Sequence, residues 1–233
     1  MIDAVLFDWG GTLTRWHDVD FHAESLALAR AVVDAPHHDP DEISTRLLAA
    51  GSLVWGRSRD HQQSATIADL FTEAGLDHDP ELLSAYYDFW EPHTATDPEV
   101  RPMWQQLKEM GLRVGVLSNT VWPREWHEGF FRRDGVLDLV DGDVYTSEVP
   151  WTKPSPLVFE AAATAVGVAD PTRCVYVGDR LFDDIWGARQ AGMRAIHIPH
   201  STIPAEQRGH TEGEPDAIAR TLSDIPDIVR RWL

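Results

Sequence analysis

The sequence has a single cysteine, only two lysines and no apolar run long enough to cross a bilayer. One cysteine excludes an intramolecular disulfide and a zinc site built from several cysteines. Basic residues are few, with 20 Lys and Arg against 38 Asp and Glu, which gives a net charge of −18. Such a charge disfavours binding to nucleic-acid phosphates and to anionic lipid surfaces. We therefore expect a soluble cytoplasmic protein that binds neither nucleic acid nor membrane.

The chain has 233 residues, of which 43% are hydrophobic, and it contains ten tryptophans. This composition argues against disorder. The length suits one large domain or a core with an insertion, because single domains usually hold about 100–200 residues. We find no internal repeat, and we expect a folded monomer or homodimer.

Short apolar runs that alternate with helical patterns predict a parallel sheet. The expected strands are residues 2–7, 112–117, 139–145, 174–177 and 194–198. Several of the intervening helical patterns stop at a glycine that suits a helix C-terminus, namely Gly111, Gly167 and Gly192. The expected fold class is α/β, with a three-layer, Rossmann-like core, and residues 217–233 are expected to form a closing helix.

Residues 15–97 interrupt this alternation and carry helical spacing only. Expected helices cover residues 21–33, 41–55, 64–74 and 80–89, and two of them begin at the Asp-Pro pairs 39–40 and 79–80. An Asp cap followed by Pro at the first helical position is a typical helix start. We expect residues 1–14 and 98–233 to form the core, and residues 15–97 to form a smaller all-helical cap that hinges near 15–20 and 92–98.

Polar side chains follow four of the five expected strands, the last strand being the exception. They are Asp8, then Ser118 with Asn119, then Lys153, and finally Asp179 with Asp183 and Asp184. Ligands of open parallel sheets bind beyond the carboxyl ends of the strands. Carboxylates at that edge suit a nucleophile and Mg²⁺ ligands, and a hydroxyl, backbone N–H groups and an ammonium suit a bound anion.

Four segments resemble the motifs of the haloacid dehalogenase (HAD) superfamily, in the family's order and near its spacing. They read DWGGTL from residue 8, LSN from residue 117, KPSPLVF from residue 153 and VGDRLFDDIWGA from residue 177. The resemblance covers about residues 1–14 and 98–200, and residues 15–97 match the position of the family's small cap. It implies a hydrolase.

The resemblance also implies a role for each matching residue. Asp8 would be the nucleophile and form an aspartyl-phosphate, with Lys153 as the second catalytic residue. Mg²⁺ would be held by Asp8, the backbone carbonyl of Gly10 and Asp179, with Asp184, or alternatively Asp183, in the outer shell. The implied phosphate ligands are Ser118, Asn119, Lys153 and Thr12.

One position departs from the family's phosphatases, which carry a second Asp two residues after the nucleophile. Here that position is Gly10. A general acid–base group contributes about 10²–10⁴-fold to a rate, so its loss slows a standard alkyl phosphatase without abolishing attack by Asp8. His17, Asp18 and Asp20 are nearby substitutes, although we favour the interpretation that they are solvated hinge residues.

We predict a Mg²⁺-dependent phosphatase that acts on a small phosphorylated metabolite, and three alternatives remain beside it. A 2-haloacid dehalogenase needs no leaving-group proton, but such enzymes usually lack the Gly-Asp pair that stands here at 178–179. A phosphoryl mutase relies on the missing acid. A catalytically impaired homologue that only binds a phosphorylated ligand is the third. A phosphonatase is excluded, because it needs a cap lysine and residues 15–97 contain none.

Several other residues have less specific interpretations. Trp9, Trp122 and Trp151 lie near the motifs and either line an apolar pocket or pack in the core or against the cap. Arg46, Arg57 and Arg59 are interpreted as surface residues, and Cys174 as a small buried hydrophobe. The histidines at 37, 38, 197, 200 and 210 lack ligand spacing and receive no function.

Overall fold

The computed structural model describes residues 1–15, 19–32, 39–199 and 210–233. Its core is a six-stranded sheet with the order β3-β2-β1-β4-β5-β6, and every neighbouring pair is parallel. The strands are β1 (Ala4–Phe7), β2 (Arg113–Ser118), β3 (Gly142–Tyr145), β4 (Cys174–Gly178), β5 (Arg194–His197) and β6 (Ala217–Ile218). The predicted α/β fold with a parallel sheet is confirmed.

Strand β1 lies at the centre of the sheet and is buried along its whole length. Its last residue, Phe7, pairs with Val116 of β2 on one side and with Val177 of β4 on the other. The carboxyl ends of these strands therefore meet at one edge. The order of the strands reverses at β1, so this edge is the switch point at which open α/β sheets bind ligands.

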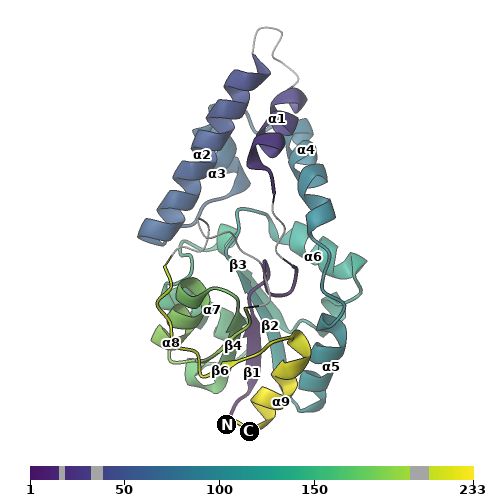
Figure 1. Ribbon diagram of the computed structural model, residues 1–233, viewed down its shortest axis with the longest axis vertical. Coiled ribbons are helices and arrows are strands. Elements are labelled where there is room, and N and C mark those ends of the chain that lie inside the picture. The colour runs from purple at the N-terminus through teal and green to yellow at the C-terminus, as the bar shows by residue number, and fades with distance from the viewer. Residues whose placement is uncertain (16–18, 33–38, 200–209) are drawn as a thin grey trace.

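Helices cover both faces of the sheet and complete three layers (Figure 1). The core helices are α5 (Val100–Glu109), α6 (Arg124–Arg133), α7 (Pro156–Ala165), α8 (Gly187–Gln190) and α9 (Ile225–Arg230). Buried side chains of α5, α6 and α9 pack with Phe7 and Val116 on one face, whereas those of α7 and α8 pack with Leu6 and Tyr176 on the other. Alternate strand residues thus face different helical layers, as the period of two requires.

The C-terminal segment differs from the single closing helix that we expected over residues 217–233. Residues 217–218 form the edge strand β6, a 3₁₀ turn covers Leu222–Asp224, and only α9 is an α-helix. The backbone N–H of Ala195 donates to a carboxylate oxygen of Asp216 at 2.8 Å, which ties this segment to β5. The free edge of β5 therefore prevails over the local helical pattern. Helix α6 was also not predicted.

Four further helices lie beyond the carboxyl ends of the strands (Figure 1): α1 (Phe21–Ala31), α2 (Pro40–His61), α3 (Ile67–Glu73) and α4 (Pro80–Trp90). Asp39 caps α2 and Asp79 caps α4, each by accepting a backbone N–H, and each is followed by Pro. Both predicted helix starts are confirmed, but α2 extends past the expected residue 55 to His61. No helix in the described ranges has the length and apolar character needed to cross a bilayer.

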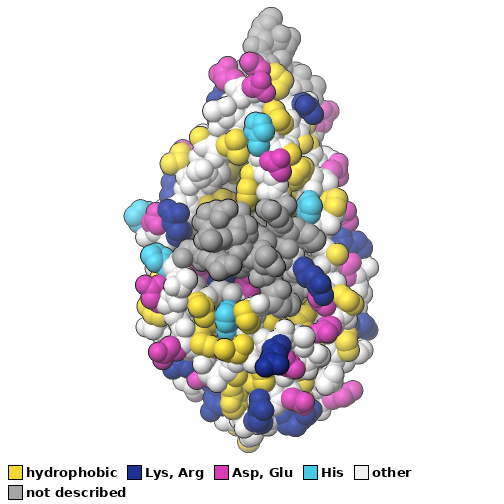
Figure 2. Space-filling model, in the orientation of Figure 1, with side chains coloured by type: hydrophobic (Ala, Val, Ile, Leu, Met, Phe, Trp, Pro, Cys, Tyr) yellow, Lys and Arg dark blue, Asp and Glu magenta, His cyan; other side chains and the backbone are white. Residues whose placement is uncertain are grey.

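Charged side chains are spread over the surface of both parts of the molecule. Figure 2 shows acidic and basic side chains interspersed on the coloured part of this face. In the helical layer, Arg57 pairs with Glu73 at 2.9 Å and Arg59 pairs with Asp60 at 2.7 Å. These arginines are half-exposed or more, which supports their interpretation as surface residues.

Cys174 is buried in β4, as expected, and burial raises the pKa of its thiol to about 12.

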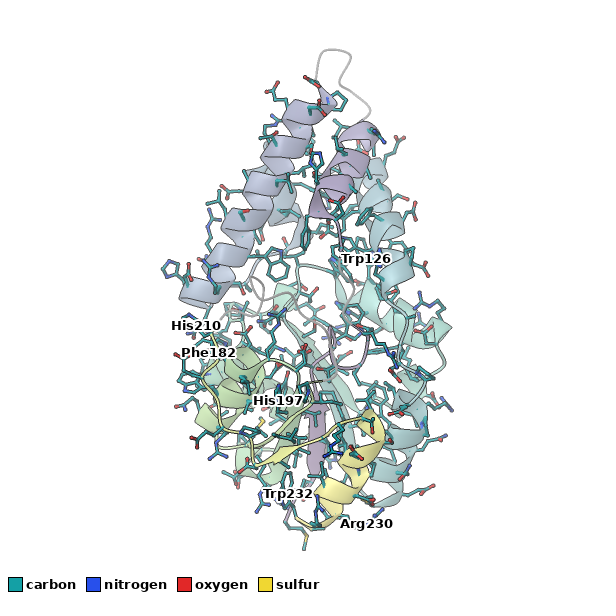
Figure 3. All side chains as sticks on the ribbon, in the orientation of Figure 1. Trp126, Phe182, His197, His210, Arg230 and Trp232 are labelled. Atoms are coloured by element: carbon teal, nitrogen blue, oxygen red, sulfur yellow. The ribbon has the colours of Figure 1, made fainter. Side chains whose placement is uncertain are left out.

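Aromatic side chains join the helical layer to the core. The ring of Trp122 lies 5.5 Å from that of Trp9 and 5.5 Å from that of Trp90 in α4, and Tyr86 approaches Trp122 at 6.5 Å. Trp126, at the boundary between the two parts in Figure 3, extends the cluster. Trp9 and Trp122 are each 8% exposed, so the structure supports packing for them rather than an open pocket wall. Trp151 is 38% exposed.

A carboxyl group is enclosed at the edge of this aromatic cluster. The indole N–H of Trp90 donates to Oε1 of Glu24 at 2.6 Å. Burial raises the pKa of Glu24 from 4.5 to about 7, although hydrogen bonds from Trp90 and Tyr86 oppose the shift. The folded protein therefore holds this proton more tightly than the unfolded chain does. The contribution of Glu24 to stability is fully present below pH 4.5 and is lost as the pH rises through about 7.

We expect Glu24→Gln to stabilise the protein at pH 8 by on the order of 2 kcal/mol, and to have little effect at pH 4.5. The reason is that the amide keeps the acceptor for Trp90 but carries no charge to bury. Urea unfolding at the two pH values measures the difference. Glu81→Gln, at the exposed start of α4, serves as the control. Equal stabilisation at both pH values contradicts the titration of Glu24.

Candidate active site

Lys153 lies at the centre of the polar groups that the strand ends bring together. Its ammonium nitrogen is 2.6 Å from Oδ1 of Asp8, 2.6 Å from Oδ1 of Asp184 and 3.1 Å from the hydroxyl of Tyr176. All four side chains are buried. An ammonium group has three N–H donors, and these three contacts use all of them. Lys153 therefore neutralises part of a buried acidic cluster.

The acidic cluster consists of Asp8, Asp179 and Asp184. One carboxylate oxygen from each lies within 4.8 Å of the others. Asp183, its neighbour in sequence, is not in this group. Asp184 enters it because the chain winds as a wide π-type turn over Leu181–Trp186, and the backbone N–H of Arg180 donates to Oδ2 of Asp184 at 2.9 Å. The structure thus brings Asp184, rather than Asp183, to Asp8.

The electrostatics of the cluster favour a cation. Burial raises the pKa of Asp8 to about 6, with Lys153 opposing and Asp184 adding to the shift. Burial, together with the charges of Asp8 and Asp184, holds the pKa of Asp179 well above its usual range. Neither carboxylate oxygen of Asp179 has a hydrogen-bond partner within the described part of the chain. Buried carboxylate oxygens without donors are suitable ligands for Mg²⁺, so the donor set fits a divalent cation.

Two glycines leave the space that these carboxylates occupy. Gly11 has φ of +90°, and a Cβ atom placed there would lie 2.2 Å from Oδ2 of Asp179. A Cβ atom on Gly178 would lie 2.3 Å from Cγ of Asp184. At these two positions a side chain would displace a carboxylate, which is why the turn after β1 and the last position of β4 need glycine.

The expected phosphate ligands lie around the same edge. Ser118 is the last residue of β2 and is buried. The side chain of Asn119 makes two hydrogen bonds to the backbone of Lys153, accepting from its N–H at 2.9 Å and donating to its carbonyl at 3.2 Å. Thr12 is fully buried, and its hydroxyl interacts with Asp8 and lowers the pKa of that carboxyl. Asn119 thus positions Lys153 through the main chain.

Gly10, which stands where the family's phosphatases carry the acid, has free space around it. A Cβ atom on Gly10 would meet nothing within 4 Å. Among the suggested substitutes, Asp20 is exposed and caps α1 by accepting from the backbone N–H groups of His22 and Ala23. That use supports a structural role for Asp20. His17 and Asp18 lie outside the described residues.

Two residues at this edge were missed from the sequence. Tyr176 donates its hydroxyl to the carbonyl of Leu117 at 3.1 Å while it contacts Lys153. Its signal was a hydroxyl inside an apolar buried strand. A ring nitrogen of His197, at the end of β5, lies 3.0 Å from the carbonyl of Asp179. The expectation that the last strand contributes no polar side chain to this edge was therefore wrong.

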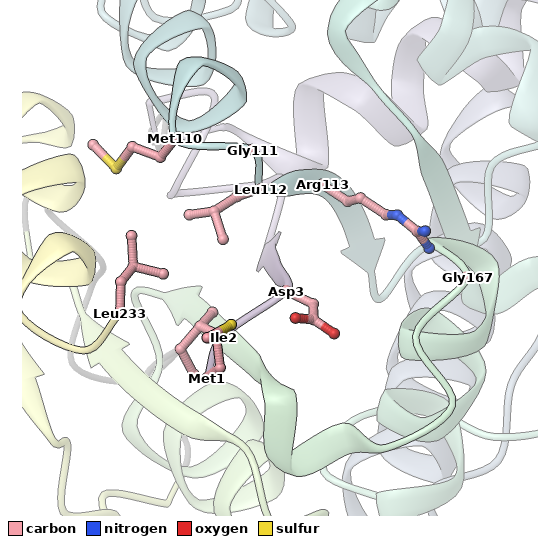
Figure 4. A pocket seen from close by; sticks show the side chains of 9 residues that line it. All are labelled: Met1, Ile2, Asp3, Met110, Gly111, Leu112, Arg113, Gly167 and Leu233. Atoms are coloured by element: carbon pink, nitrogen blue, oxygen red, sulfur yellow. The ribbon is translucent and has the colours of Figure 1, made fainter.

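A separate cavity of about 450 Å³ lies at the opposite end of β1 (Figure 4). It is lined by Asp3, Leu112, Arg113 and Leu233, among others. Asp3 precedes β1 and Asp8 follows it, so the strand separates this cavity from the acidic cluster.

Comparison with known proteins relates the chain to one family. A family model described as "Hydrolase: haloacid dehalogenase-like hydrolase" matches residues 2–192. A glyceraldehyde 3-phosphate phosphatase of Methanothermobacter thermautotrophicus is 37% identical over 98% of this chain and 100% of its own, and one of Methanopyrus kandleri is 29% identical over 99% and 98%.

Solved structures give the same relationship. A HAD phosphatase from Thermococcus onnurineus is 25% identical, with a TM-score of 0.68 over 98% of both chains. A 2-haloacid dehalogenase from Pseudomonas syringae is 25% identical, with a TM-score of 0.67 over 100% of both.

Proposed function

This chain belongs to the haloacid dehalogenase-like hydrolases, and we propose that it is a Mg²⁺-dependent phosphatase that acts on a small phosphorylated metabolite. One observation carries the proposal: three buried carboxylates within 4.8 Å of one another, two of them bound to one buried lysine. Such a cluster is costly to bury. A catalytic role explains why this cost is tolerated: the carboxylates supply a nucleophile and ligands for a cation, and the lysine helps to bind an anion.

Asp8 is the nucleophile in this proposal. Its carboxylate oxygen forms a bond to phosphorus while the bond from phosphorus to the ester oxygen breaks, and the leaving oxygen takes a proton from water, because Gly10 supplies no acid. Water then breaks the phosphorus–oxygen bond of the aspartyl-phosphate, which releases phosphate and restores Asp8. Lys153 keeps Asp8 ionised through its charge. It also offers positive charge to the phosphoryl group, together with Ser118 and the N–H of Asn119.

Asp8, Asp179 and the backbone carbonyl of Gly10 would hold Mg²⁺, with Asp184 in the outer shell in preference to Asp183. The bound ion would shield the negative charge of the phosphoryl group from that of Asp8. Because the carboxylate oxygens of Asp179 make no hydrogen bond to the described residues, they are suited to serve as metal ligands.

The substrate class follows from the relatives and from the helical layer. Two relatives that match the chain along almost its whole length are named glyceraldehyde 3-phosphate phosphatases. We propose a substrate of similar size. Residues 15–97, which contain helices α1–α4, would act as a cap that closes over it. Closure of such a cap excludes water and completes specificity.

A panel of small phosphorylated metabolites, including glyceraldehyde 3-phosphate, tests this function. We expect phosphate release that requires Mg²⁺ and stops with EDTA. Release of chloride from 2-chloropropionate without added Mg²⁺ would instead support a dehalogenase, such as the Pseudomonas syringae structure. Binding of phosphate without turnover of any substrate would support the impaired homologue.

Restoring the missing acid gives a further test. We expect Gly10→Asp to raise kcat on alkyl phosphates by about tenfold, because an acid there protonates the leaving alkoxide. The site has room, since a Cβ at Gly10 meets nothing within 4 Å. Activity on p-nitrophenyl phosphate, whose leaving group needs little protonation, should change much less, and Gly10→Asn is the matched control without the acid. An equal gain on both substrates, or none with the fold intact, argues for another acid.

A further inference from the structure

We propose that His197 is a positioning residue for the Mg²⁺ site, acting through the main chain of Asp179. This inference rests on the proposed function, because it takes Asp179 as a metal ligand. His197 itself would touch neither metal nor substrate. Its ring hydrogen-bonds the main chain that carries the ligand.

The contact is well defined in the sheet. His197 is the last residue of β5 and pairs with Gly178 of β4, and the N–H of Ile198 donates to the carbonyl of Gly178 at 2.9 Å. This register places the ring beside the next residue, Asp179, whose carbonyl oxygen lies 3.0 Å from Nε2 of His197. A carbonyl oxygen only accepts hydrogen bonds, so the ring donates its Nε2–H. Figure 3 shows His197 at this part of the sheet.

Asp179 depends on its main chain for orientation. Its two carboxylate oxygens receive no hydrogen bond from any described residue. Gly11 leaves the space that the carboxylate occupies, and the ring of His197 donates a hydrogen bond to the main-chain carbonyl of Asp179. When the ring is lost, the peptide that carries the ligand loses the side-chain hydrogen bond to its carbonyl. The expected consequence is a less well-placed carboxylate.

Loss of the His197 ring should affect the orientation of Asp179 more than the stability of the fold. The main-chain bonds of His197 remain after any substitution, including the bond that its carbonyl accepts from Ala219 at 2.9 Å. The side chain is about half-buried, so its removal opens no large cavity. Residues that orient metal ligands in this indirect way typically contribute about 10–100-fold to metal affinity.

The test compares His197→Leu with His197→Gln in the full chain. Leu and Gln are close in size, but only Gln keeps an N–H donor near the position of Nε2. The probe is Mg²⁺ alone, titrated calorimetrically, with the Mg²⁺ dependence of p-nitrophenyl phosphate hydrolysis as a second measurement. His78→Ala, in the loop before α4, is the control, and His197→Ala replaces the Leu variant if that does not fold.

We expect the Kd for Mg²⁺ to rise about tenfold in His197→Leu and to stay within about threefold of wild type in His197→Gln. At saturating Mg²⁺, kcat of both variants should approach that of wild type. An unchanged Kd in His197→Leu, or an equal loss in both variants, overturns the role of His197 while wild-type Mg²⁺ binding preserves the proposed function. Failure of the wild-type protein to bind Mg²⁺ overturns the metal site and the inference with it.

Discussion

Replacing Asp8 with Asn should reduce phosphatase activity by about 10⁴-fold or more, because an amide cannot form the covalent intermediate. The change is nearly isosteric, and Lys153 keeps its 2.6 Å contact with Asp184. We therefore expect a folded protein. Since burial raises the pKa of Asp8 to about 6, removal of its charge should leave the metal-free protein at least as stable as wild type at pH 8.

The control for this variant lies on the same strand. Asp3→Asn changes a carboxylate at the other end of β1, where it pairs with the half-exposed Arg173. We expect it to keep activity within about threefold of wild type, since exposed ion pairs contribute little. Initial rates with p-nitrophenyl phosphate and circular dichroism of all three proteins make the comparison. Substantial activity in folded Asp8→Asn would remove Asp8 as the nucleophile.

Replacing Lys153 with Met should cost about 3–5 kcal/mol of unfolding free energy at pH 8 and abolish detectable turnover. Removing one partner of a buried ion pair leaves the other charges without compensation, and here Asp8 and Asp184 would both lose their cation. The pKa of Lys153 is raised well above its ordinary value, chiefly through Asp184 and Asp8 acting against the effect of burial. The lysine is therefore charged throughout the accessible pH range.

This loss of stability should depend on pH in a defined direction. Asp8 has a raised pKa of about 6 even with the lysine present, and without it the pKa moves higher. Below that value Asp8 is neutral, so the penalty should be smaller at pH 5 than at pH 8.

The other lysine of the chain is the matched control. Lys108 pairs with Asp141 at 2.5 Å, but it is 35% exposed, so Lys108→Met should cost less than about 1 kcal/mol. Guanidinium unfolding of both variants at the two pH values measures these differences. Equal losses for Lys108→Met and Lys153→Met would show that the buried charge cluster is not what stabilises this edge.

The family, the fold class and the enzyme class were predictable from the sequence, and all three are confirmed. The prediction worked because buried parallel strands appear as short apolar runs, and because the first residue after each run lies at one edge of the sheet. Asp8 and Ser118 follow this rule directly, and Asp179 lies one residue further along the chain, after Gly178. Their catalytic and binding roles stay predictions until the variants are measured.

Other features depend on contacts between distant segments. The backbone path from Arg180 onward decides that Asp184, and not Asp183, faces Asp8. The edge of β5 decides that residues 217–218 pair as a strand. Local sequence carries little information on either, since both alternatives satisfy the same local pattern.

By itself, the sequence determined which residues stand at the ends of the buried strands, since hydrophobic burial and a period of two leave few alternatives for such runs. Only the tertiary structure decided that Tyr176 and His197 reach Lys153 and Asp179. The first contact joins two side chains and the second joins a side chain to a main-chain carbonyl, in both cases between distant segments. Their geometry follows from strand register and side-chain direction, which the local sequence of one segment does not determine.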